Sequence, residues 1–441
     1  MIPIVTIVSA LAVILLAASL AYSVLTIVAA RRYLRGRPPS LAAAQDPDER
    51  KGCVSALPEA KNSLRSGRGE LRSCPWSSAQ ASAEPISILK PLAGLDLGLE
   101  SNLRTFFEQD YANFEILFAV RRADDPAVGV VEKLRSEYSG VSSRLIVTGE
   151  PPYPNAKVYS LDCMLGEAAH DLVVMSDSDI CVTPGLLRAA AAEFQDPKLG
   201  VATCPYRAIA GASLWSRLEA TGMNVNFLAG ILVARMLEGM HFAVGPTIVA
   251  RRKALESIGG FRRMKDYLAE DFILGKFAAE AGQGVILSSY VVEHHIGSSD
   301  FLHNAQHRLR WARSTKRSRP LGYLGQALTM PLPWALALCA VNPSWWPALV
   351  VTLMLRAASA YVVSTRVLGV KPNWALVPLE DLVAFTFWVA GLFGKTVVWR
   401  GRRYLLDSDG RFELLQDLSG AIRTAPSPPV VAGLAQASNP K

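Results

Sequence analysis

The apolar residues of this 441-residue chain gather in two long blocks near its ends and in short runs through its middle. Residues 2–30 are almost free of charge, and residues 31–37 then contain four arginines. A helix needs about 20 apolar residues to cross a bilayer, and cytoplasmic flanks are rich in Arg and Lys. A cleaved signal peptide would be shorter and would carry its basic residues first. We therefore predict a retained transmembrane anchor at 1–30, followed by a cytoplasmic domain.

The second block, from Leu321 to Trp399, begins with a segment that is too short and too broken to cross a membrane as one helix. Pro331 and Pro333 interrupt it, and proline removes backbone donors from a helix interior. Irregular backbone is tolerated at membrane depth only where protein or water covers it. We predict that 321–341 is an interfacial or re-entrant segment.

The rest of the second block contains two longer apolar segments, 345–367 and 374–399. Basic residues precede and follow the block, so both flanks are expected in the cytoplasm and the number of crossings must be even. We predict two transmembrane helices within 343–399 and a cytoplasmic tail at 400–441.

Residues 38–84 differ in composition from both neighbours, since they are rich in Ser, Arg, Gly, Glu and Pro and show little periodicity. Such a segment cannot bury enough apolar surface to order its backbone. We predict a disordered linker.

The net charge of +8 raises the question of a nucleic-acid partner. The basic residues cluster beside the apolar segments, however, where anionic lipid headgroups explain them better than phosphate backbones do. We expect a lipid bilayer as partner and no nucleic acid.

Within 85–315, short apolar runs alternate with amphipathic stretches. Runs at 86–89, 114–120, 144–148 and 172–176 are typical of buried strands, and the stretches between them of helices. Strands that alternate with helices form a largely parallel sheet. The predicted fold class is therefore α/β, with transmembrane helices at the N-terminal and C-terminal ends of the chain.

The run at 172–176 stops on two carboxylates, Asp177 and Asp179. Ligands of α/β sheets gather at the carboxyl ends of strands, and residues two apart on a strand share a face. Two hard oxygen ligands there suit Mg²⁺ or Mn²⁺ carrying a diphosphate. This is the Asp-x-Asp arrangement of nucleotide-sugar transferases, although Asp-Ser-Asp is also ordinary turn chemistry. We predict a metal site at Asp177 and Asp179.

Two further acidic pairs lie at comparable places. Asp124 and Asp125 follow the run at 114–120, where the alternative is a solvated loop that caps the next helix. Glu270 and Asp271 stand in an apolar setting, where the alternative is a helix first turn that favours acids electrostatically. The apolar neighbours of Asp271 are expected to raise its pKa by desolvation.

A basic and aromatic cluster, His307, Arg310 and Trp311, precedes the second apolar block. Arginine binds diphosphate oxygens with two parallel hydrogen bonds, and Trp offers a flat apolar wall. The alternative is a basic juxtamembrane helix without a ligand.

In order and spacing, these motifs resemble inverting glycosyltransferases of families 2 and 21 with a GT-A fold, most closely the ceramide glucosyltransferase-like group. The resemblance covers 86–311, and the flanking membrane segments match the same layout. Bacterial members that glycosylate hopanoids are similar, and 154–158 resembles their lysine-bearing loop. The motifs are Ile88–Gly94, Phe106–Tyr111, Asp124–Pro126, Asp177–Ser178, Ala269–Asp271 and Arg310–Trp311.

The resemblance implies a role for each matching residue. Asp125 helps to hold the nucleotide, Asp177 binds the metal diphosphate, and Asp271 is the catalytic base. Substrate-binding roles fall to Lys157, His307, Arg310 and Trp311. Two positions depart from the pattern: His307 stands where the family usually has Gln or Arg, and Asp179 is a second metal ligand that the Asp-Ser-Gly of eukaryotic ceramide enzymes lacks.

The implied activity is transfer of a hexose from a UDP-sugar donor to the hydroxyl of a membrane lipid acceptor, with Mg²⁺ or Mn²⁺ as cofactor. Ceramide and UDP-glucose follow from the nearest group, whereas bacteriohopanetetrol and UDP-N-acetylglucosamine follow from the hopanoid relatives. The expected location is a bacterial inner membrane, with the catalytic domain in the cytoplasm. The alternative of another class is a non-enzymatic, membrane-tethered binding module.

Overall fold

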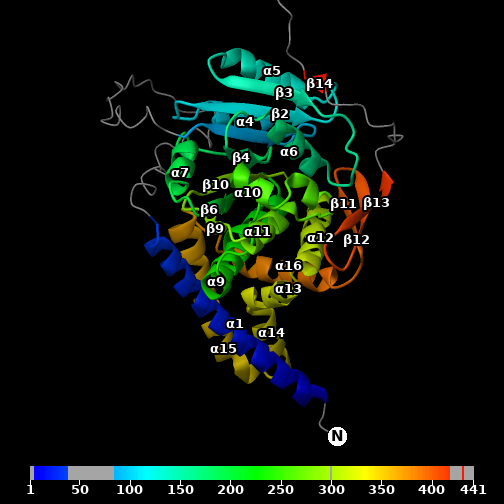
Figure 1. The fold of residues 1–441 in the computed structure, drawn as a ribbon. Coiled ribbons are helices and arrows are strands. Elements are labelled where there is room, and N and C mark those ends of the chain that lie inside the picture. The colour runs from blue at the N-terminus through cyan, green and yellow to red at the C-terminus, as the bar shows by residue number, and fades with distance from the viewer. Residues whose placement is uncertain (1–3, 38–83, 298–299, 418–429, 432–441) are drawn as a thin grey trace, which may run out of the picture.

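The computed structural model describes residues 4–37, 84–297, 300–417 and 430–431 (Figure 1). The predicted linker at 38–84 lies outside these residues except for Glu84.

A central eight-stranded sheet forms the upper part of the molecule in Figure 1, in the order β14-β3-β2-β1-β4-β8-β6-β9. Strands β1 to β4 are parallel to one another, whereas β8 runs antiparallel to both β4 and β6. The predicted α/β class is confirmed. The strands are β1 Ile86–Pro91, β2 Phe114–Val120, β3 Ser142–Val147, β4 Leu172–Ser176, β6 Leu199–Thr203, β8 Thr247–Arg251, β9 Gly284–Leu287 and β14 Val430–Val431.

The sheet buries both of its faces because its strands are continuous apolar runs. Ile86 and Ile88 of β1 face one core, whereas Leu89 faces the other. The first core is covered by α4 Leu99–Phe107, α5 Ala127–Glu137 and α7 Leu186–Glu193, and the second by α6 Ala156–Glu167, α10 Arg252–Ser257 and α11 Glu270–Glu280. A smaller sheet pairs β5 Ile180–Cys181, β10 Val292–Ile296 and β7 Tyr206–Ala210.

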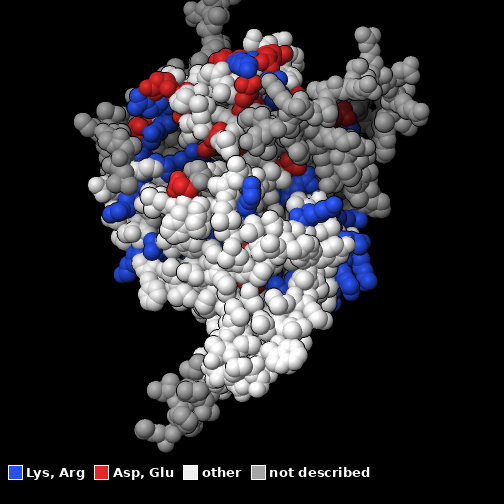
Figure 2. All heavy atoms as spheres, turned by 180° about the vertical axis from the view of Figure 1, so that it is seen from behind, with Lys and Arg blue, Asp and Glu red and all other residues white. Residues whose placement is uncertain are grey.

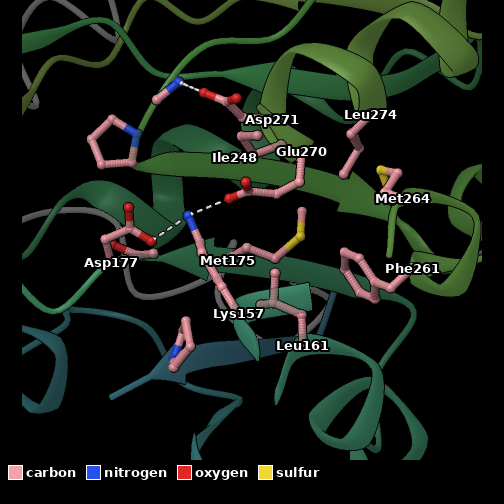
Figure 3. Close-up of a pocket in the computed structure, with 14 residues that line it drawn as sticks. Lys157, Leu161, Met175, Asp177, Ile248, Phe261, Met264, Glu270, Asp271 and Leu274 are labelled. Carbon is pink, nitrogen blue, oxygen red and sulfur yellow. Dashed lines mark hydrogen bonds and ion pairs between the residues drawn. The ribbon is translucent and has the colours of Figure 1, made fainter. Parts of the chain in front are cut away.

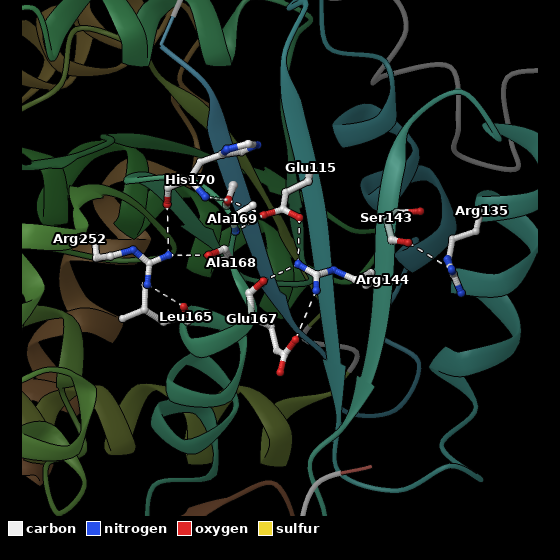
Figure 4. Close-up of polar contacts among 11 residues, drawn as sticks. Glu115, Arg135, Ser143, Arg144, Leu165, Glu167, Ala168, Ala169, His170 and Arg252 are labelled. Atoms are coloured by element: carbon white, nitrogen blue, oxygen red, sulfur yellow. Dashed lines mark hydrogen bonds and ion pairs between the residues drawn. The ribbon is translucent and has the colours of Figure 1, made fainter. Parts of the chain in front are cut away.

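Polar contacts hold the turn between α6 and β4 in place (Figure 4). The buried carboxylate of Glu115, on β2, accepts hydrogen bonds from the Ala169 backbone N–H at 2.6 Å and the Ser87 hydroxyl at 2.7 Å. It also lies 3.1 Å from the Arg144 guanidinium. Arg252 donates to the carbonyl oxygens of Leu165, Ala168 and His170. These contacts fix the chain where it enters β4, whose far end carries the candidate site.

Replacing Glu115 with alanine is expected to lower the free energy of unfolding by about 2 kcal/mol, because the substitution leaves a buried N–H and a hydroxyl without their acceptor. Thermal unfolding in detergent micelles measures the change. Glu132 on α5, half-exposed and paired only with Arg135 among the described residues, is the matched control and should shift little when replaced by alanine. Equal unfolding temperatures for the two variants would contradict the assignment.

Apolar helices form the narrow lower end of the molecule (Figure 1). Helix α1, Ile4–Arg35, crosses α14 Leu332–Val341 and α15 Trp346–Tyr361 and contacts both. On α15, Trp346 and Met354 expose 64% and 65% of their surface, as expected for side chains that face lipid. Figure 2 shows this end almost free of charge, with Lys and Arg on both flanks just above it.

Three helical segments in the described part of the chain are long and apolar enough to cross a membrane, namely Ser9–Arg35, Leu214–Glu238 and Pro343–Val367. The segment at Leu214–Glu238 was not anticipated. It consists of α8 Leu214–Gly222, the π-helical turn Met223–Phe227 and α9 Leu228–Glu238, and α9 packs along α1. Its four charged residues lower its mean hydropathy below that of Ser9–Arg35, so the sequence marks it only weakly.

The segment around Pro331 and Pro333 is bent. Helix α13, Pro320–Gln326, and its extension to Thr329 meet α14 at 63°. The position of this segment, at the membrane surface or as a re-entrant loop, stays a prediction.

The predicted second membrane helix at 374–399 is wrong in extent. Helix α16 covers only Leu376–Gly391, and Thr396–Trp399 forms strand β11. This strand pairs with β12 Arg402–Leu406, which pairs with β13 Phe412–Asp417. The first part of the predicted tail at 400–441 is therefore a folded sheet that packs on α12 Phe301–Ser318.

Hydropathy alone could not predict how α16 packs, because it takes no account of the ion pairs that its two acids form with other helices. Asp381, fully buried, forms an ion pair of 2.6 Å with Arg356 of α15. Glu380 forms one of 2.7 Å with Arg308 of α12. Buried charges are tolerated when they are paired and hydrogen-bonded, so these contacts join α16 to α15 and to α12.

Candidate functional site

Charged side chains from three elements meet at the carboxyl end of β4 (Figure 3). The Lys157 ammonium lies between the carboxylates of Asp177, at 2.7 Å, and Glu270, at 2.9 Å. Asp271 lines the same pocket, whose apolar wall includes Met175. The structure thus brings together three residues that the sequence singled out, Lys157, Asp177 and Asp271.

Lys157 is placed by the start of α6. Asn155 caps this helix by accepting a hydrogen bond from the Val158 N–H, and its amide donates to the Tyr267 carbonyl at 2.8 Å. Burial alone would lower the pKa of Lys157, but the Asp177 and Glu270 carboxylates outweigh it and raise the pKa. Lys157 is therefore a fixed positive charge on the floor of the pocket.

Asp271 sits in the first turn of α11. Its Oδ2 accepts a hydrogen bond from the Gly245 N–H at 2.6 Å and its Oδ1 accepts one from the Phe272 N–H at 2.7 Å. Gly245 has φ +66°, and a Cβ there would approach the Tyr206 ring to 2.7 Å, so a side chain would displace this contact. Burial and the neighbouring Glu270 raise the pKa of Asp271 to about 6, in the predicted direction. A carboxylate with this pKa can accept a proton near neutral pH.

Asp177 and Asp179 do not share a strand face as predicted, because β4 ends at Ser176 and both lie in the turn that follows. Asp177 faces Lys157, whereas Asp179 Oδ2 lies 3.1 Å from His294 Nε2. Burial opposes ionisation of Asp179, but the interaction with His294 outweighs it and lowers the pKa of the carboxyl. His294 is thus a partner of the site that the sequence left unassigned.

The residues fit a divalent cation. The side chains of Asp177 and Asp179 are each about one third exposed, at 32% and 33%, and both offer hard oxygen donors. Oδ1 of Asp179 is buried and has no hydrogen-bond partner among the described residues, and such an atom ordinarily finds one. The two carboxylates would hold Mg²⁺ or Mn²⁺.

Lys90 lies beneath this turn and was not assigned a role from the sequence. Its side chain is fully buried on β1, donates to the backbone carbonyl of Asp177 and lies 3.8 Å from the centre of the Phe106 ring. Burial lowers its pKa to about 7. A lysine inside an otherwise apolar strand was the available signal, since a buried charge needs a specific partner.

Asp125 lies outside this pocket. Its carboxylate accepts from the Gly94 N–H at 3.0 and 3.1 Å and from the Ala127 N–H at 2.9 Å, at the start of α5. It therefore joins the loop after β1 to a helix terminus, as the capping alternative expected. A contact between Asp125 and the nucleotide stays a prediction.

Helix α12 carries the basic and aromatic cluster, and its His307 and Arg310 have different partners. His307 Nδ1 is hydrogen-bonded to the buried carboxylate of Glu219, and its ring packs on Trp311 at 5.1 Å. Arg310 lies over the Trp399 ring at 5.9 Å and has no ion pair with another described residue. Burial lowers its pKa to about 10, with Glu270 as the largest opposing charge. Arg310 is the cation left available for an anionic ligand, whereas His307 is engaged.

Known proteins with a similar sequence include ceramide glucosyltransferases. Ceramide glucosyltransferases 1 and 3 of Caenorhabditis elegans are 28% and 30% identical over 210 and 212 residues, which is 46% of this chain. The matches cover 44% and 45% of those proteins, so the chain spans less than half the length of the curated relatives it matches.

Solved structures are similar at lower identity. The mannosyltransferase PcManGT from Pyrobaculum calidifontis, in complex with GDP-Man and Mn²⁺, is 17% identical with a TM-score of 0.49, over 88% of this chain and 99% of that chain. S. aureus TarS 1–349 in complex with UDP-GlcNAc is 14% identical with a TM-score of 0.37, over 76% and 100%. The model of the family described as "Glycosyl transferase family 21" matches residues 52–412. Because that match spans most of the chain, including every candidate site residue, the protein belongs to glycosyl transferase family 21.

Proposed function

We propose that the protein is an inverting glycosyltransferase that moves a hexose from a UDP-sugar to the hydroxyl of a membrane lipid. The observation that carries the proposal is the pocket at the end of β4, where Asp271, with a pKa of about 6, lies beside Lys157 and Asp177. Family membership and the likeness to ceramide glucosyltransferases support the same chemistry.

The residues of this pocket have separate roles in a direct displacement at the anomeric carbon of the sugar. Asp271 removes the proton from the attacking hydroxyl, since an acceptor of protons works best when its pKa is near the working pH. Lys157 and Arg310 place positive charge where the leaving diphosphate would lie. A bound Mg²⁺ or Mn²⁺, held by Asp177 and Asp179, supplies further neutralisation of that diphosphate.

Trp311 and the loop held by Asp125 have supporting roles in this scheme. Trp311 packs against Phe227, between the helices α8 and α9, and shapes the acceptor entrance. Asp125 fixes the loop after β1 beside the nucleotide. His307 orients Trp311 from within the cluster rather than binding diphosphate itself.

The acceptor is a lipid because the domain rests on apolar helices. Removing a long acyl chain from the bilayer costs about 0.8 kcal/mol for each CH₂ group, so the active site must reach the membrane surface. The arginines at the end of α1 support a cytoplasmic position for the domain, and a bacterial inner membrane is the location we propose. Ceramide with UDP-glucose is the first donor and acceptor pair to test, because both curated relatives above carry that acceptor in their names.

The test is a lipid-product assay on membranes that contain the protein. Radiolabelled UDP-glucose or UDP-N-acetylglucosamine is supplied with Mn²⁺ and either ceramide or bacteriohopanetetrol. Labelled glucosylceramide is the expected product, and a labelled N-acetylglucosaminyl hopanoid would keep the reaction class and change both substrates. Binding of UDP without any lipid product from the four pairings would favour the membrane-tethered binding module.

A further inference from the structure

The turn between β11 and β12 has a residue that its geometry does not favour. Trp399 pairs with Arg402, so the turn consists of Arg400 and Gly401 alone, with φ of +48° and +74°. A two-residue hairpin turn with positive φ at both positions prefers Asn-Gly, because most side chains clash there. Arg400 is the sole non-glycine residue with positive φ in the described part of the chain. Backbone strain of this kind persists where the side chain has a use.

The Arg400 side chain contacts the loop that follows β1. Nη1 and Nη2 lie 3.2 Å from Oδ1 and Oδ2 of Asp96, in the parallel fork that arginine makes with carboxylates, and Nη1 donates to the Ala93 carbonyl at 2.9 Å. Asp96 and Ala93 belong to the loop 92–98 after β1. More than 300 residues therefore separate the partners along the chain.

Asp96 also contacts the turn that contains Asp177 and Asp179. Oδ2 of Asp96 accepts a hydrogen bond from the Ser178 hydroxyl, and Ser178 stands between Asp177 and Asp179. The Ser178 carbonyl in turn accepts from the Asn102 amide at 3.3 Å. The order of contacts is Arg400 to Asp96 to Ser178, which ends at the two side chains that fit a divalent cation.

These contacts are poor candidates for a purely structural role. The side chains of Arg400 and Asp96 are 50% and 24% exposed, and exposed ion pairs contribute little to stability. The hairpin is anchored elsewhere, by Trp399 under Arg310 and by the packing of β11 on α12. The hairpin therefore does not depend on the Arg400–Asp96 ion pair for its position.

We propose that Arg400 is a positioning residue of the donor site: it holds Asp96, and through Asp96 the turn at Ser178, so that Asp177 and Asp179 stay in place to bind a metal diphosphate. The inference rests on the proposed function and extends it to the carboxyl-terminal sheet. It assigns to the turn between β11 and β12 a part in donor binding.

The test uses Arg400→Asn in the full-length, detergent-solubilised protein, with calorimetric titration of UDP in the presence of Mn²⁺. Asparagine is the better turn residue, so the unfolding temperature should stay equal or rise. The dissociation constant for UDP, and the KM for the UDP-sugar, should rise about tenfold while kcat changes less than threefold. Arg400→Lys, which retains the charge without the fork, should recover part of the loss.

Two further variants make the result specific. Asp96→Asn should weaken UDP binding as Arg400→Asn does, and the double variant should be no weaker than either, because both break one chain of contacts. Arg403→Asn is the matched control, since Arg403 is an exposed arginine on β12 of the same hairpin and should leave UDP binding unchanged.

Unchanged UDP binding by Arg400→Asn, beside a wild type that binds UDP, would overturn this inference alone. An equal loss in Arg403→Asn would do the same, because it would reduce the effect to net charge. Failure of the wild type to bind UDP with Mn²⁺ would overturn the proposed function itself.

Discussion

Asp271→Asn is expected to lower kcat about 1,000-fold while the dissociation constant for UDP with Mn²⁺ changes less than threefold. Asparagine keeps the size of the side chain and can still accept from the Gly245 N–H, but it cannot take a proton from the acceptor hydroxyl. Steady-state assays with the labelled UDP-sugar give kcat, and calorimetry gives the UDP affinity. The effect is the largest expected here because Asp177 and Glu270, the other carboxylates of the pocket, are both paired with Lys157.

The pH profile supplies an independent check on Asp271. Its raised pKa of about 6 means that the carboxyl is protonated, and the base lost, as pH falls through that value. The activity of the wild type should therefore rise from pH 5 to pH 7 with a midpoint near pH 6. Glu280→Gln, at the exposed far end of α11, is the control and should retain the profile. Normal turnover by Asp271→Asn, or its loss of UDP binding, would count against the assignment.

Asp177→Ala is expected to weaken Mn²⁺-dependent UDP binding at least about 100-fold. Loss of a residue that merely supports a metal ligand typically costs 10- to 100-fold in metal affinity, so loss of a direct ligand should cost no less. The substitution also leaves Lys157 with Glu270 as its remaining ion-pair partner among the described residues. Titration of UDP with and without Mn²⁺ measures the change, since the metal-independent part of binding should be less affected.

The control for this variant lies at the opposite end of β4. Asp171 immediately precedes β4 at its amino end, its side chain is 83% exposed, and Asp171→Ala should bind UDP like the wild type. A fall in affinity for both variants would indicate a general loss of folding, and an unchanged affinity for Asp177→Ala would remove Asp177 from the metal site.

Local sequence determined the elements that carry the chemistry. The apolar run at 114–120 became β2 with the same limits, and the run at 172–176 became β4. These strands could be predicted from the sequence because a strand buried on both faces is a continuous apolar run. The acids at their ends could be predicted with them because they follow directly in the chain. For the same reason the arginine-flanked block at 1–30 predicted the helix α1.

Contacts between distant residues were decided by the tertiary structure. Hydropathy counted 374–399 as one apolar segment, but Glu380 and Asp381 pair with Arg308 and Arg356, and the segment ends in a strand. No local pattern joins Asp179 to His294, or Asp96 to Arg400. A pattern of period 2 or 3.6 records only which face of an element is buried. Which charges pair, across 25 to 304 residues of chain, depends on how those faces pack, and this packing brings single acidic and basic residues together in one site.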